Sequence, residues 1–92
     1  MVKFKGIVFA VQDDMKEFHD KDKDGNRLPT KTAHRITQIS MSVKNGKMPV
    51  AVTFSGFDLP ANFQLPNIDQ EWESPSVREF KQVSPLVCEC RL

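Results

Sequence analysis

Two alternating runs joined by Asn45-Gly46 constrain the fold of this chain more than any other feature. Before the dipeptide, apolar residues stand at every second position from Ile39 to Val43, and after it they do so from Val50 to Phe54. Asn-Gly favours the type I′ turn, whose twist matches that of two antiparallel strands. The pattern therefore predicts a β-hairpin with one face in the core and the other in water.

Further strands are predicted at both ends of the chain. Val2 to Val11 alternates up to Gly6 and is apolar at every position after it, which predicts a strand that bends at Gly6 and is then buried on both faces, as in a small closed barrel. The closing stretch "LVCECRL" alternates from Leu86 to Leu92 and predicts a last strand.

Two segments leave alternatives open. Residues 11–18 have apolar spacing that fits two helical turns, but an extended ribbon is the rival interpretation. Residues 76–83 fit either a helical turn with a capping box or the start of a strand. The proline-rich stretch 57–75 is predicted to be a long connection that packs onto the barrel, because a free linker would lack its apolar content. Ile36 is out of phase with Ile39, which predicts a bulge between them.

Length limits what the chain can do. Its 92 residues predict one domain, 1–92, with a core just large enough to fold and no room for an elaborate cleft. No pair of carboxylates, nucleophile with base, or metal set stands at a spacing that catalysis requires. A binding module rather than an enzyme is expected, without a cofactor. The 13 Lys and Arg against 12 Asp and Glu give a net charge of only +1, so attraction to nucleic acid would depend on local clustering.

The cysteines indicate a reduced environment. Cys88 and Cys90 are separated by one residue, a spacing too short for an unstrained disulfide within a strand, so an intracellular, cytoplasmic protein is expected. Together with His19 and His34 they offer four zinc-type ligands, but the C-x-C spacing differs from that of zinc fingers, so two buried thiols that pack as small apolar groups are the simpler interpretation. The apolar run near the amino terminus is too short for a signal peptide or a membrane span, and no membrane association is expected.

The stretch "DKDKDGNRLPTK" begins like a calcium-binding loop. Asp20, Asp22 and Asp24 occupy the first three ligand positions of an EF-hand, and Gly25 occupies the position of its turn glycine. Position 12, which needs a bidentate glutamate, is Lys31, so a charged turn without a metal is the favoured interpretation.

Basic and aromatic residues on predicted strands and loops remain as the main chemical signal. A groove lined by cations tracks phosphates, and exposed rings stack on bases. The competing interpretation is that the rings form the core and the lysines maintain solubility. The candidate nucleic-acid-binding residues are Lys3, Lys5, Lys21, Lys23, Arg27, Lys31, Arg35, Phe9, Phe57 and Trp72.

The stretches "DGNRLPT" (24–30) and "KNGKMPVAVTF" (44–54) resemble parts of the OB-fold single-stranded DNA-binding proteins of filamentous bacteriophages. The resemblance implies a small five-stranded OB-fold-like β-barrel, with one short helix as an option, that acts as a homodimer and coats single-stranded DNA during phage or mobile-element replication in the host cytoplasm. The resemblance assigns phosphate contacts to four cations of the charged loop and to one cation of the strand that follows it. These are Lys21, Lys23, Arg27, Lys31 and Arg35.

Those phage proteins stack bases on tyrosines, and this chain has none, so Phe or Trp would have to stack. Single-stranded DNA binding without chemistry is the first expectation. The alternative is a small β-sheet module for protein interaction or assembly that uses the segment from Phe57 to Trp72 as its partner surface.

Overall fold

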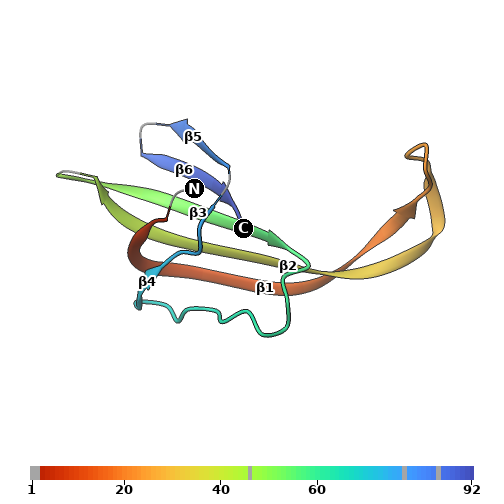
Figure 1. Cartoon of the computed structure of the whole chain (residues 1–92), viewed down its shortest axis with the longest axis horizontal. Coiled ribbons are helices and arrows are strands. Elements are labelled where there is room, and N and C mark those ends of the chain that lie inside the picture. Colours follow the sequence, from red (N-terminus) through yellow and green to blue (C-terminus); the bar gives the residue numbers. More distant parts are fainter. Residues whose placement is uncertain (1–2, 46, 78, 85) are drawn as a thin grey trace.

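One curled sheet of six strands makes up the fold in the computed structural model, which describes residues 3–45, 47–77, 79–84 and 86–92 (Figure 1). The strand order is β4-β1-β2-β3-β6-β5; β3 and β6 run parallel, and the other neighbours run antiparallel. The described residues contain no helix, and so none long and apolar enough to cross a membrane. The strands are β1 Lys5–Lys21, β2 Arg27–Asn45, β3 Met48–Phe57, β4 Glu71–Glu73, β5 Phe80–Ser84 and β6 Val87–Arg91.

The predicted all-β class is confirmed, but the strand count is six and not five. The unexpected strand is β4, three residues inside the long connection. It pairs with the start of β1, where Gly6 lies opposite Trp72. A strand this short has no readable alternation, so only its partner could reveal it. The helical option over 76–83 is wrong, because β5 occupies the second half of this range and none of its described residues is helical.

The central hairpin agrees with its prediction. β2 and β3 pair without a break from Ile36↔Phe57 to Asn45↔Met48; Gly46 lies outside the described residues. The closing strand β6 is also confirmed. Alternate residues of these strands and of β1 form the core on the concave side of the sheet. The buried apolar side chains are those of Val8, Ile39, Met41, Val52, Phe54, Val77, Cys88 and Cys90.

The first strand departs from its prediction. Val2 lies outside the described residues, and the segment after Gly6 is not buried on both faces: Val8 is buried, whereas Ile7 and Phe9 are 44% and 51% exposed. The register shift in this part of the sheet falls at Phe9, between Val8 and Ala10, and not between Ile36 and Ile39, where the ladder is regular. Ile36 is out of phase because it lies on the opposite face of the sheet from Ile39.

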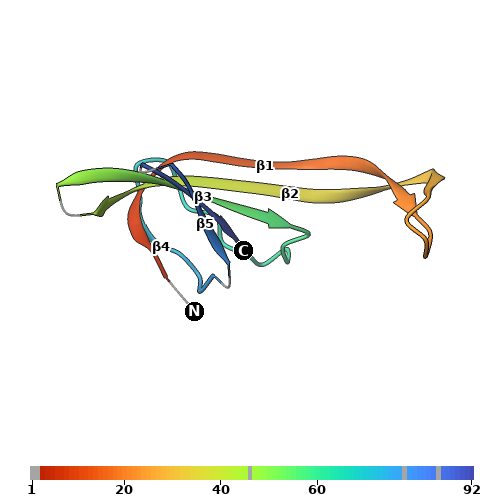
Figure 2. The same ribbon diagram turned by 90° about the horizontal axis from the view of Figure 1, so that it is seen from above.

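The hairpin of β1 and β2 extends well beyond the rest of the sheet (Figure 2). Its pairing continues to Lys21↔Arg27, whereas β3 stops pairing with β2 at Ile36, so only two strands continue outward. The molecule is accordingly elongated, with extents of 51 × 26 × 20 Å. The ribbon interpretation of residues 11–18 is therefore confirmed over the helical one.

The two cysteines pack as small apolar side chains. Both are free and buried, and they point to the core from β6. Burial, with a further contribution from the neighbouring Cys88, raises the pKa of the Cys90 thiol from its ordinary 9.0 to about 11.

We expect iodoacetamide at pH 8 to modify Cys90 about a hundredfold more slowly in the folded protein than in urea, since only the thiolate reacts. Peptide mass spectrometry over a labelling time course measures both rates; equal rates would contradict the burial of this thiol.

Candidate nucleic-acid interface

The protruding part of the hairpin, residues 15–35, is here called the ribbon. A two-stranded ribbon is marginal in water by itself, so side chains must stabilise it. At its tip, Asp22 accepts hydrogen bonds from the backbone N–H groups of Asp24 and Asn26, both at 2.9 Å. These bonds lower the pKa of Asp22. Gly25 supplies the positive φ of 84° that the turn requires, as its position in the sequence predicted.

Asp20, the first aspartate of the calcium-like motif, also stabilises the ribbon. The hydroxyl groups of Thr30 and Thr32 donate to the two carboxylate oxygens of Asp20, at 2.8 and 2.6 Å. These two bonds lower the pKa of Asp20. Within the residues that the structure describes, no group of three or more His, Cys, Asp or Glu side chains could hold a metal ion. The alternating aspartates therefore have a structural use in the ribbon that needs no cation.

Arg35 connects the base of the ribbon to the connection that follows β3. Its guanidinium donates to both carboxylate oxygens of Asp13, at 2.9 and 3.1 Å, and to the carbonyl oxygen of Pro60 at 2.8 Å. Thr37 completes the site by donating to Asp13 at 2.9 Å. Arg35 was a candidate phosphate ligand from the sequence, but in this structure its donors are directed at the protein itself.

Removing this ion pair should loosen the base of the ribbon in a pH-dependent way. The hydrogen bond from Arg35 is the first cause that lowers the pKa of Asp13 below its ordinary 3.8. A lowered folded-state pKa gives stability that is complete above the unfolded value and is lost as the pH falls through the folded value. We expect Asp13→Asn to lower the thermal unfolding midpoint at pH 7, and the difference from wild type to shrink below pH 3.8.

The matched control for that prediction is Asp14→Asn, one residue along on the opposite face of β1. It should leave the midpoint nearly unchanged, because surface charges without a close partner contribute little. Thermal unfolding followed by circular dichroism between pH 2 and 7 measures both variants. Equal midpoint losses for the two variants at pH 7 would refute the role given to Asp13.

Three aromatic rings meet on the convex face of the sheet, where the ribbon leaves it. His34 stacks on Phe57 with ring centroids 4.8 Å apart, and Phe18 lies 6.0 Å from His34 and 6.3 Å from Phe57. We call these three residues the ring cluster. The His34 ring is held in place by donating from Nδ1 to Asp58, at 2.7 Å. Phe57 and Phe18 nevertheless remain 59% and 43% exposed.

The ring cluster shares its face with a cation and several polar side chains. Lys16 lies directly opposite His34 in the ladder, and its ammonium has no ion pair within the described residues. By strand alternation, Gln12 and Gln38, which are also cross-strand partners, lie on this same convex face. Asp14 adds one negative charge beside them. We call the convex surface formed by β1, β2 and β3 around these side chains the outer face.

Sequence reasoning identified Phe57 but missed Phe18, His34 and Lys16. The missing signal was the extended state of residues 12–20. Once that segment is a strand, Lys16 and Phe18 fall on one face at every second position. The helical spacing of Phe18 with Val11 and Met15 obscured this arrangement.

The other sequence candidates are spread over the molecule. Lys3 and Lys5 form ion pairs with Glu73 and Glu71, at 3.8 and 3.0 Å, where β1 meets β4. Trp72 packs its ring against Phe54, 5.5 Å away, and belongs to the margin of the core. Phe9 is exposed at the bulge of β1. The structure therefore does not gather these candidates around the ring cluster.

The remaining candidate cations lie on the ribbon. Lys21 and Arg27 are cross-strand partners at its end, Lys23 is in the tip, and Lys31 lies opposite His19. The ribbon as a whole carries six Lys and Arg residues against four Asp and Glu residues. Asp20 and Asp22 keep their negative charges, but their oxygens are engaged in hydrogen bonds within the ribbon, and in the described part of the chain Lys21, Lys23, Arg27 and Lys31 form no ion pair.

Comparisons with protein-family models, with curated proteins and with solved structures gave no match to this chain.

Proposed function

We propose that this protein binds single-stranded DNA without chemistry, through the ribbon and the outer face. In this proposal, the ring cluster stacks on bases while Lys16 and the ribbon cations contact phosphates. The ribbon cations proposed to act with Lys16 are Lys21, Lys23, Arg27 and Lys31; Arg35 is engaged with Asp13. The setting we propose is phage or mobile-element replication in a host cytoplasm, as the sequence resemblance implies.

The strand order supports the proposal that this curled sheet is an OB-type barrel. The two outermost strands, β4 and β5, follow each other in the chain with only residues 74–79 between them. If they count as one interrupted strand, the curled sheet is a ring of five, the number in an OB-fold. OB-folds bind oligonucleotides on the face of their second and third strands and with the loop that joins the first two. The outer face and the ribbon correspond to these positions.

The observation that carries the proposal is the exposure of the ring cluster. Phe57 is 59% exposed and the neighbouring Phe18 is 43% exposed, and both lie on the polar side of the sheet. Neighbouring apolar rings exposed in this way add nothing to the core and are typical of a binding surface. The adjacent Lys16 and the ribbon cations supply charge of the sign that a polyanion requires. Flat rings next to cations are the combination that single-stranded nucleic acids recognise.

The test is a titration of fluorescently labelled oligo-dT, read by anisotropy, because Trp72 is a core-margin residue and a poor reporter of contacts at the outer face. We expect binding that weakens with salt, with a log-log slope of about −3.5 for five phosphate contacts. A duplex of equal length should compete less well, since its bases are not free to stack. Absence of binding to oligo-dT at low salt and micromolar protein would refute the proposal.

A second candidate function is assembly through the outer edge of the sheet, where β5 pairs only with β6 in the described part of the chain. Phe80, Val83 and Leu86, on and beside this strand, are 55%, 47% and 44% exposed. Exposed apolar side chains on an edge strand favour pairing with another chain, and a second copy of this protein would give the implied homodimer. Analytical ultracentrifugation of wild type and Phe80→Ser distinguishes the two cases: a monomer in both would reject assembly.

A further inference from the structure

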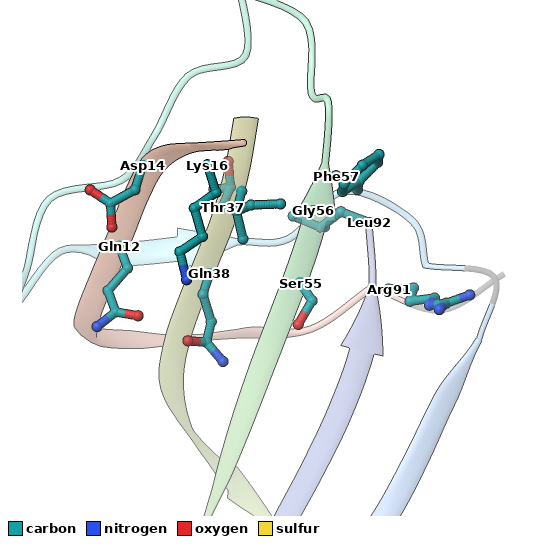
Figure 3. Close-up of a pocket in the computed structure, with 11 residues that line it drawn as sticks. Gln12, Asp14, Lys16, Thr37, Gln38, Ser55, Gly56, Phe57, Arg91 and Leu92 are labelled. Atoms are coloured by element: carbon teal, nitrogen blue, oxygen red, sulfur yellow. The ribbon is translucent and has the colours of Figure 1, made fainter. Parts of the chain in front are cut away.

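We infer that the hollow on the outer face beside the ring cluster is a pocket for one nucleobase, read by the side-chain amides of Gln12 and Gln38. This inference rests on the proposed function, and it adds a prediction that the protein discriminates between bases. The hollow has a volume of about 630 Å³, within the range typical of small-ligand sites. β1, β2 and β3 form its floor, and the last residues of β6 lie at its edge (Figure 3).

The two amides are placed to act on one group. Gln12 and Gln38 are direct partners in the β1–β2 ladder, so their Cβ atoms are about 5 Å apart on one face. Figure 3 shows both side chains projecting from neighbouring strands, with Lys16 and Ser55 nearby. Within the described residues neither amide has a hydrogen-bond partner. Each can therefore present a donor and an acceptor to the edge of a base, the pairing that makes glutamine a base-reading residue.

The lining of the hollow carries charges of both signs. Asp14 is in the lining and would repel a phosphate close to it. Lys16 and Arg91 are in the lining too; the Lys16 side chain extends toward Gln38, and Arg91 lies on the β6 side (Figure 3). Phe57 and Ile36 add apolar surface at the end next to the ring cluster. A neutral, flat, hydrogen-bonding group fits this distribution, with its flanking phosphates at Lys16 and Arg91.

The test compares labelled homopolymers of dT, dC and dA of one length under identical salt. We expect wild type to prefer one of them over another by about tenfold, the range that one bidentate amide contact supplies. Gln12→Ala/Gln38→Ala should reduce this ratio to less than about threefold while leaving the salt slope unchanged, because no cation is removed. Gln82→Ala, an exposed strand glutamine on β5, is the matched control and should keep the wild-type ratio.

Each outcome is decisive. Wild type that binds all three homopolymers equally, or a double variant that retains the wild-type ratio, would overturn the base pocket while leaving single-strand binding intact. If wild type bound none of the three homopolymers, both the pocket and the proposed function would be overturned. A salt slope reduced in the double variant would assign the glutamines to phosphate contacts and would also overturn the inference.

Discussion

Gly6→Ala is expected to destabilise the fold more than any other single methyl group added to this chain. A Cβ at position 6 would collide with the carbonyl oxygen of Ser42, and would lie 2.9 Å from the carbonyl carbon of the same residue. Both atoms are backbone atoms inside β2, and they cannot move without breaking the ladder between β1 and β2. Gly6 also pairs with Trp72, so β4 would be displaced as well.

We expect a loss of about 3 kcal/mol or more in the free energy of unfolding, at the upper end for overpacked cores. For a domain of this size, that loss lowers the thermal midpoint by roughly 12 °C or more. Gly25→Ala is the control, because it adds a methyl group in open space at a φ of +84° and should cost only about 1 kcal/mol. Thermal or urea unfolding followed by circular dichroism measures both. A Gly6→Ala protein no less stable than Gly25→Ala would show that β1 and β2 do not approach as closely as described.

Phe18→Ala/Phe57→Ala is expected to weaken binding of oligo-dT by about a hundredfold. Stacking of one base on an aromatic side chain contributes about 1–3 kcal/mol, so each ring accounts for about tenfold or more. Both side chains are exposed and lie outside the core, so their loss should change the unfolding midpoint little. The salt slope should remain, because no cation is removed.

Ile68→Ala is the matched control for the ring cluster. Ile68 is 58% exposed, close to the value for Phe57, but it lies in the connection before β4, outside the outer face. Its replacement should leave the affinity for oligo-dT within about twofold of wild type, as expected for a surface substitution away from a site. Anisotropy titrations at several salt concentrations measure all variants. If the double variant also bound within twofold of wild type, the ring cluster would not be a stacking surface.

The elements predicted well are those whose signal is local. The hairpin around residues 39–54 has two regular alternations and a turn dipeptide whose conformational preference matches the twist of the strands. The closing strand β6 places Cys88 and Cys90 in the core by alternation alone. The bulge or bend predicted at Gly6 is less well placed, because the register shift of β1 falls at Phe9. Gly6 instead lies against the backbone of Ser42, and this close approach was not readable from the sequence.

The candidate site was only partly predictable. Phe57 and the ribbon cations follow from residue type and from the turn at Asp24-Gly25. The neighbours of Phe57 do not, because Phe18 and His34 belong to two other strands and reach it only through the registers of β1, β2 and β3. Arg35 shows the reverse case: its sequence suggests a free cation, but the register places Asp13 within reach.

The sequence alone determined the all-β class, the hairpin and the chemistry of the ribbon, because each depends on neighbouring residues and on a period of two. The tertiary structure decided which face each side chain shares with residues from distant segments. It paired Gln12 with Gln38, brought Phe18 and His34 to Phe57, engaged Arg35 with Asp13, and formed β4 from three residues without a pattern of their own. Such contacts are set by strand register across the sheet, and a shift of one residue would exchange the outer face for the core.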